Sequence, residues 1–143
     1  QDELKALDLL EEDESESADL LRYEIYWKLQ QWAKVVDVMR RLFKASDPKP
    51  RKPLNDKQAS RLLNFVIALA LSGGDRTIMR IRKDYGSVME NHKLGEAFKL
   101  VTEPKTPGFL NPNLVSAKVL KAETFLSDYR DRLKEGLPLS AIN

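Results

Sequence analysis

The stretch NDKQASRLLNFVIALALSGG, residues 55–74, decides the fold class. Asn55 is of a type that caps helix starts, and Gly73 and Gly74 are typical of a helix end. Between them, apolar residues recur every three or four positions, which predicts a helix with a broad apolar face: Ala59, Leu62, Leu63, Val66, Ile67 and Leu71. We expect this helix to be the most buried. Its apolar run over 65–71 is far shorter than the roughly 20 residues of a membrane span, so no membrane insertion is expected for this segment.

Downstream of this helix, we expect a second one that completes a hairpin over about 55–89, with Asp75 as its cap. A short helix over about 93–101 follows. Three prolines within 103–112 then predict a loop. Over about 113–134, apolar residues repeat in steps of three and four, which predicts a long closing helix that caps the domain.

Upstream, the segment 47–53 carries three prolines among basic residues, and prolines exclude a continuous helix. Apolar residues at helical spacing over 18–46 lose phase near Trp32, which predicts an antiparallel hairpin over about 17–45. Residues 1–16 form an acidic lead, expected to be partly disordered or a short helix. The sequence therefore predicts an all-α chain in which residues 17–143 form a single domain of stacked antiparallel hairpins.

The segment 18–48 resembles a tetratricopeptide repeat (TPR). The aromatic and inward-facing places of that repeat correspond to Tyr26, Trp32, Val35, Met39 and Leu42. The match is degenerate, because Pro48 falls one residue late and Tyr23 and Gln30 replace small residues. A looser unit covers 56 to about 85, and the C-terminal part resembles that of large bacterial, notably alphaproteobacterial, TPR proteins. The resemblance implies a right-handed superhelix that offers a concave face to peptides or proteins, without catalysis.

Composition narrows the class of protein further. The chain has 143 residues, a net charge of +2 and no cysteine, which allows a real core and excludes disulfides, thiolate metal sites and cysteine nucleophiles. Residues 1–17 hold eight acids, and residues 40–61 hold eight bases, so the molecule is expected to be bipolar. The acidic lead is a solvated segment or an electrostatic tether that masks the chain's own basic surface. A cytoplasmic location is slightly favoured, and a periplasmic one would need a signal upstream.

No catalytic residues, cofactor site or metal site can be assembled from the sequence. His92 is the only histidine, and metal binding or acid-base catalysis would need oriented partners that the sequence does not offer. We therefore expect an exposed loop histidine and no enzymatic activity.

Two sets of residues are candidates for binding a partner. The basic candidates are Arg40, Arg41, Lys44, Arg51 and Lys52. These bases are suited to binding an acidic protein or peptide. Nucleic acid is a less favoured partner, because no aromatic residues are interleaved with the bases. The third interpretation is a solvated helix face and loop without a binding role. Trp27 and Trp32 are aromatic anchors or core residues.

The leading functional hypothesis is a TPR-like, non-catalytic module for protein interaction or scaffolding. The alternative is a phosphate- or nucleic-acid-binding helical domain that acts through residues 40–61. The oligomeric state stays open.

Overall fold

The computed structural model describes residues 2–103, and the regular structure of this part is entirely helical. Its helices are α1 (Asp2–Leu10), α2 (Glu16–Lys28), α3 (Trp32–Ala45), α4 (Asp56–Ser72), α5 (Asp75–Met89) and α6 (Gly95–Thr102). The prediction of an all-α chain is confirmed for these residues. The predicted loop over 103–112 and closing helix over about 113–134 lie, apart from residue 103, outside the described residues.

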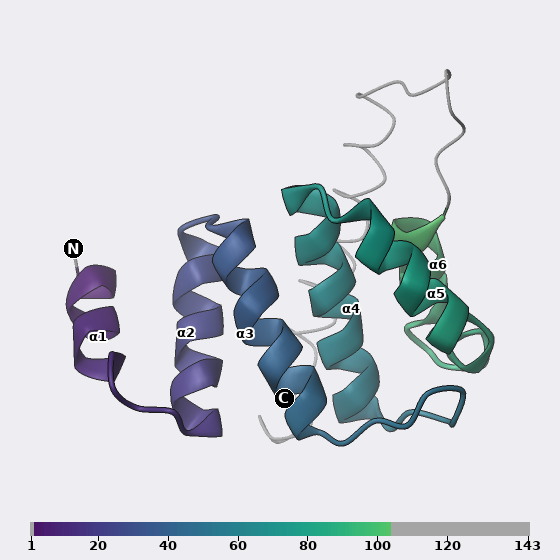
Figure 1. Ribbon diagram of the computed structural model, residues 1–143, viewed down its shortest axis with the longest axis horizontal. Helices are drawn as coiled ribbons and strands as arrows, with labels where there is room; N and C mark the ends of the chain where they lie inside the picture. Colours follow the sequence, from purple (N-terminus) through teal and green to yellow (C-terminus); the bar gives the residue numbers. More distant parts are fainter. Residues whose placement is uncertain (1, 104–143) are drawn as a thin grey trace.

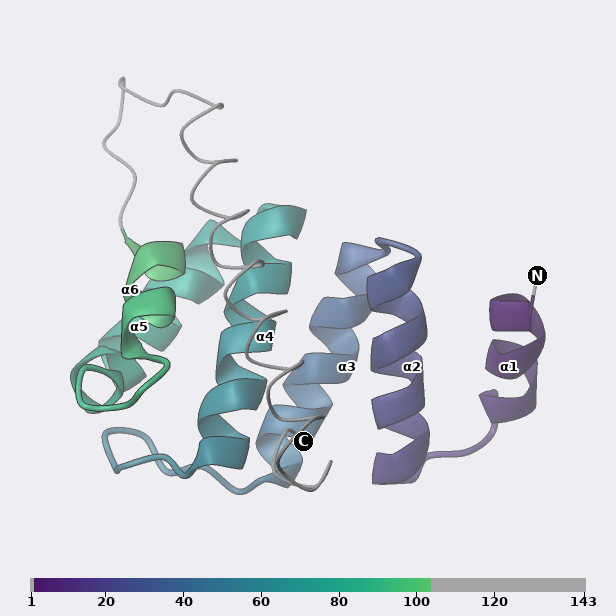
Figure 2. The same cartoon turned by 180° about the vertical axis from the view of Figure 1, so that it is seen from behind.

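The helices form a row in which each contacts the next along the chain, and α4 also contacts α6. In Figure 1, α3 and α5 lie toward the viewer, while α2, α4 and α6 lie behind them; Figure 2 shows the reverse. Helix α1 stands at one end of the row, and α5 and α6 stand at the other. Alternate helices therefore form two layers, with α4 near the centre of the core.

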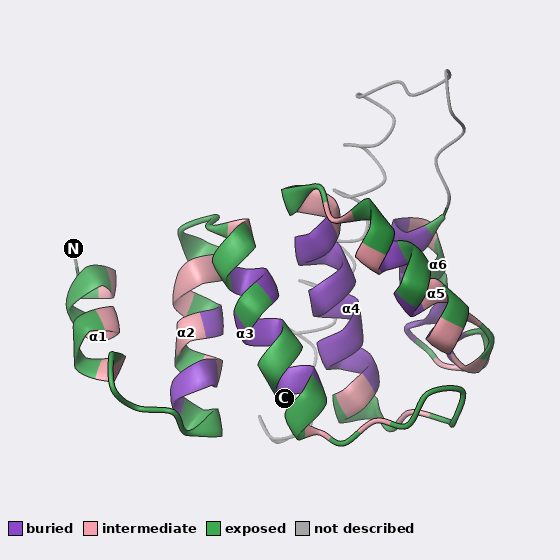
Figure 3. Ribbon diagram, in the orientation of Figure 1, coloured by how far each residue is buried: buried purple, intermediate pink, exposed green. Residues whose placement is uncertain are grey.

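Helix α4 begins and ends as its sequence predicts. The side chain of Asn55 accepts a hydrogen bond from the backbone N–H of Gln58, whose own side chain accepts from the Asn55 N–H, so the two form a capping box. Gly73 ends the helix with a φ of 87°, a left-handed conformation that favours glycine. All residues from 59 to 69 are buried, and the middle of α4 is coloured accordingly in Figure 3. Burying a Leu or Ile side chain contributes roughly 1.5–3 kcal/mol.

Helix α3 buries one face and exposes the other. Its buried residues follow helical spacing and join the core with those of α4: Val35, Val36, Val38, Met39, Leu42 and Phe43. Exposed positions alternate with them along the helix (Figure 3). Helix α2 contributes less to the core, since Tyr23 is its only large apolar side chain that is fully buried.

Two glycines permit the close approaches at the end of the row. Gly74, not Asp75, occupies the cap position of α5, and a Cβ on Gly74 would lie 2.6 Å from Cδ2 of Leu69. The prediction that Asp75 caps this helix was therefore wrong, because Asp75 is already the first residue of α5 and the cap position has no side chain to accept a hydrogen bond. At the start of α6, a Cβ on Gly95 would lie 2.1 Å from the carbonyl oxygen of Met89.

The proline-containing connection between α3 and α4 is an ordered loop. Asp47 and Arg51 have φ values of 55° and 64°, the left-handed conformation that lets the chain turn back. The Arg51 N–H donates a 3.1 Å hydrogen bond to the carbonyl oxygen of Asp84 in α5. This bond fixes the loop beside α5.

Candidate interaction surface

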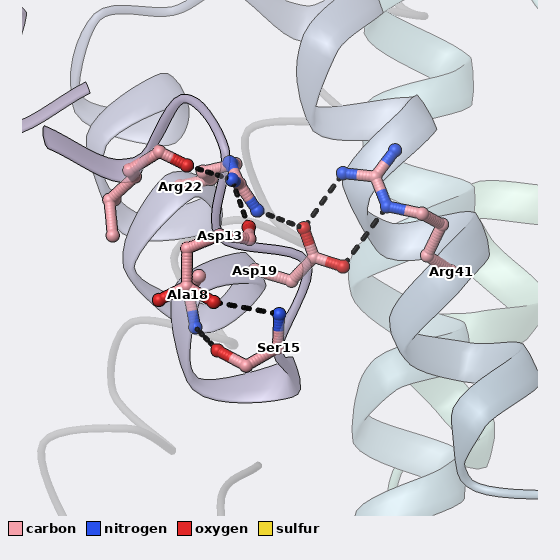
Figure 4. A network of polar contacts seen from close by, with 7 residues as sticks. Asp13, Ser15, Ala18, Asp19, Arg22 and Arg41 are labelled. Carbon is pink, nitrogen blue, oxygen red and sulfur yellow. Dashed lines mark hydrogen bonds and ion pairs between the residues drawn. The ribbon is translucent and has the colours of Figure 1, made fainter. Parts of the chain in front are cut away.

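The basic stretch 40–61 does not form one surface, because part of it pairs with acids of α2. Arg41 of α3 donates from Nε to Oδ2 of Asp19 (3.0 Å) and from Nη2 to Oδ1 (2.7 Å), as Figure 4 shows. The hydrogen bonds from Arg41 hold the pKa of Asp19 below its usual value, although burial of the carboxyl opposes this. Asp19 is thus an ion-pair partner that joins α2 to α3.

Arg22 ties the acidic lead to the same carboxylate. Its Nη1 donates to Oδ1 of Asp19 at 2.9 Å, and its Nη2 donates to the carbonyl oxygens of Leu10 and Asp13 (Figure 4). Ser15 then begins α2 by accepting from the backbone N–H of Ala18. The lead is therefore held against α2 by its backbone, and the carboxylates of the lead stay largely exposed.

An open cavity of about 650 Å³ lies beside this network. Its lining includes Glu11, Glu14 and Asp37 together with Lys34 and Arg41. Among the described residues, five acids and three bases line it, and they include Asp19 and the two arginines that pair with it.

Arg61 is the largest departure from a solvated basic face. Its side chain is 2% exposed, and it donates to the carbonyl oxygen of Leu42 (2.7 Å) and to the Glu16 carboxylate. The hydrogen bond from Arg61 lowers the pKa of Glu16. Lys57 lies 3.7 Å from the same carboxylate, so α2, α3 and α4 meet around these groups.

The other bases of the stretch remain at the surface. Arg40 pairs with Asp37 at 3.3 Å and lies over the Phe65 ring, with its guanidinium carbon 5.7 Å from the ring centroid. Lys49 pairs with Asp47 at 3.0 Å. These are exposed pairs, which contribute little to stability.

Helix α5 extends this positive surface with bases that lie outside the predicted stretch. Six exposed cations of this region have no carboxylate partner among the described residues, and we call them together the basic face: Lys44, Arg51, Lys52, Arg76, Arg80 and Lys83. The bond from Arg51 to α5 brings the loop to this helix, and the Phe43 ring of α3 meets the Tyr85 ring edge-on at 5.5 Å. The sequence did contain a signal for these additional bases, because the spacing of four and three between positions 76, 80 and 83 predicts that they share one face of a helix.

The two candidate tryptophans lie against each other. Their ring centroids are 5.2 Å apart in a T-shaped contact, and Tyr23 meets Trp27 edge-on at 5.6 Å. Trp27 and Trp32 are half-buried and pack against the core. The nearby Lys28 pairs with Glu3 at 2.6 Å, and its hydrogen bond lowers the pKa of Glu3 to about 2.

His92 lies in the loop between α5 and α6, as predicted, but it is not exposed as the sequence suggested. Its side chain is 12% exposed; Nε2 lies 2.9 Å from Oδ1 of Asp56, and Nδ1 accepts the backbone N–H of Leu94 at 3.0 Å. Lys93 donates to the other Asp56 oxygen at 3.1 Å and is the main cause of its lowered pKa. The histidine was mispredicted because its partner lies 36 residues away.

The described residues contain no cluster of three or more His, Cys, Asp or Glu side chains that could hold a metal ion. In the same part of the chain, no helix is long and apolar enough to cross a membrane. No protein-family model matches the sequence, and comparison with curated proteins and with solved structures found no significant match.

Proposed function

We propose that this chain is a non-catalytic module for protein interaction or scaffolding, built from TPR-like stacked hairpins. The two alternating layers of helices and the contacts between successive helices support this proposal. The resemblance of residues 18–48 to a TPR unit agrees with it. Such stacks present long surfaces, and a partner binds to one of them.

The observation that carries the proposal is the unpaired charge of the basic face. Arg41 and Arg61 are paired with Asp19 and Glu16, whereas the cations of the basic face have no such partner in the described structure. Exposed charges of one sign attract a complementary surface and speed its association. An acidic protein segment is the partner that this surface fits best.

The shifted pKa values support a structural role for most charged groups. Glu16, Asp19 and Asp56 have lowered pKa values, and each makes at least one ion pair with a residue outside its own helix. Catalytic sites also gather such groups around a cavity where substrate binds, and Asp19 does line the open cavity of about 650 Å³. Both oxygens of Asp19 are held by Arg22 and Arg41, however, so these ion pairs account for its lowered pKa.

The basic face also fits phosphates, so a nucleic-acid-binding domain is the second candidate. The large apolar side chains exposed in the described part are leucines and one methionine, and none is an aromatic ring on which bases stack. Affinity for an oligonucleotide that is present at low salt and falls steeply with salt would favour this candidate.

Charge reversal on the basic face tests the proposed function. The variant Lys44→Glu/Lys52→Glu changes two exposed lysines of the face, and Lys34→Glu/Lys99→Glu makes the same change at exposed lysines elsewhere. Affinity purification with the parent chain, from cells that express it, captures its partner proteins. The control variant should capture the same proteins, and the variant of the basic face should not. Equal capture by all three chains would remove the basic face from the proposal.

A further inference from the structure

The acidic counterpart of the basic face lies on the same chain, at the end of the row formed by α1. Four exposed carboxylates there have no basic partner among the described residues, and we call them together the acidic end: Asp8, Glu11, Glu12 and Glu14. Helix α1 contains no buried residue, and its Leu4 and Leu9 are 59% and 86% exposed. A nine-residue helix this short is marginal without tertiary packing, so α1 offers both charge and apolar area to a partner.

The two charged surfaces cannot meet within one described chain. Figures 1 and 2 show α1 at one end of the row and α5 at the other, with α2, α3 and α4 between them. The connection from α1 is anchored by Arg22, which holds the carbonyl oxygens of Leu10 and Asp13. The acidic lead therefore does not cover the basic face of its own molecule in the described structure. Contact between the acidic end and the basic face requires two molecules.

We infer that the basic face of one molecule binds the acidic end of a second copy, head to tail. Charge complementarity selects this occupant, and the apolar contacts agree: Met79 on α5 is 61% exposed and lies between Arg76 and Lys83, where it can meet Leu4 or Leu9. Two different surfaces then form the contact, so association continues to a third copy unless a ring closes. This inference rests on the proposed function, because it names a partner for the same face.

The association should be weak and sensitive to salt. Both surfaces are exposed, and exposed charges are screened once the salt concentration shortens the Debye length below their separation. The dissociation constant should rise roughly tenfold between about 50 mM and about 500 mM salt.

Sedimentation velocity of the whole chain tests the inference. The weight-average mass should grow with protein concentration at low salt and approach the monomer value at high salt. Lys83→Glu and Glu12→Lys should each weaken the association roughly threefold to tenfold. The controls Lys99→Glu and Glu24→Lys reverse exposed charges on α6 and α2 that belong to neither surface, and they should leave the association unchanged.

Mixing the two interface variants is the decisive step. The acidic end of Lys83→Glu is intact and so is the basic face of Glu12→Lys, so an equimolar mixture should recover a larger mass than either variant alone. The inference would be overturned if the chain were a monomer under all conditions, or if neither charge reversal weakened the association. If the chain stays monomeric while Lys44→Glu/Lys52→Glu still loses captured proteins, the proposed function stands and the face binds another acidic partner. If the chain stays monomeric and this variant captures the same proteins as the parent, both the inference and the proposed function are overturned.

Discussion

The guanidinium group of Arg61 is buried where α2, α3 and α4 meet, and it is hydrogen-bonded to the Leu42 carbonyl and to Glu16. Arg61→Ala should lower the free energy of unfolding by about 2–4 kcal/mol, because it removes packed methylene groups and two hydrogen bonds. Arg61→Met keeps most of the volume and should recover about half of that loss. Urea unfolding followed by circular dichroism measures both changes.

Lys57→Met is the matched control, because Lys57 lies near the same carboxylate but is 44% exposed. It should change stability by less than about 0.5 kcal/mol. A change below about 1 kcal/mol for Arg61→Ala would contradict the role assigned to this residue. The burial of Arg61 was missed in the sequence because arginine in a charged stretch is usually solvated, and its partner Glu16 lies 45 residues away. The available signal was the apolar sequence on both sides of it, since a helix that is apolar all round is buried.

At the scale of elements, two glycines at the same end of the row should respond in opposite ways to alanine. Gly95→Ala should destabilise the fold by about 1–3 kcal/mol, because its Cβ would lie 2.1 Å from a backbone oxygen of Met89. Gly86, inside α5, meets only the Arg82 side chain at 3.6 Å. Gly86→Ala should therefore stabilise the fold by about 0.5–1 kcal/mol. Thermal and urea unfolding measure both, and a stabilised Gly95→Ala variant would contradict the close approach of α6 to the end of α5.

The helices were predictable from local signals, and the contacts between them were not. The cap at Asn55, the stop at Gly73 and the spacing of three and four all act within a few residues, so α4 could be predicted closely. The cap of α5 was predicted one residue late, at Asp75 instead of Gly74, because both residue types are common at helix starts and local sequence does not choose between them. The basic face mixes residues from α3, a loop and α5, so no single stretch of sequence contains it.

The pH dependence of stability belongs to the whole molecule, because lowered carboxylate pKa values occur from α1 to α4. A carboxylate whose pKa is lower in the folded than in the unfolded chain stabilises the fold above the unfolded value, near 4, and loses this contribution as pH falls through the folded value. Glu16, Asp19 and Asp56 all have lowered pKa values, so the free energy of unfolding should fall steadily below about pH 5.

Asp19→Asn isolates one of these contributions. The variant should be less stable than the parent at pH 7 and should lose less stability between pH 7 and pH 3, because asparagine does not titrate. Asp8→Asn changes an exposed carboxylate that has no basic partner within residues 2–103 and should follow the parent curve. Parallel curves for Asp19→Asn and the parent would show that the Asp19 ion pairs do not set the acid sensitivity.

The central claim at this scale is that a row of helices presents a basic face to an acidic protein partner. The most direct measurement is the affinity of one purified, captured partner for three chains: the parent, Lys44→Glu/Lys52→Glu and Lys34→Glu/Lys99→Glu. The account predicts binding at least roughly tenfold weaker for the face variant and parent-like binding for the control. Equal affinities for all three chains would contradict it.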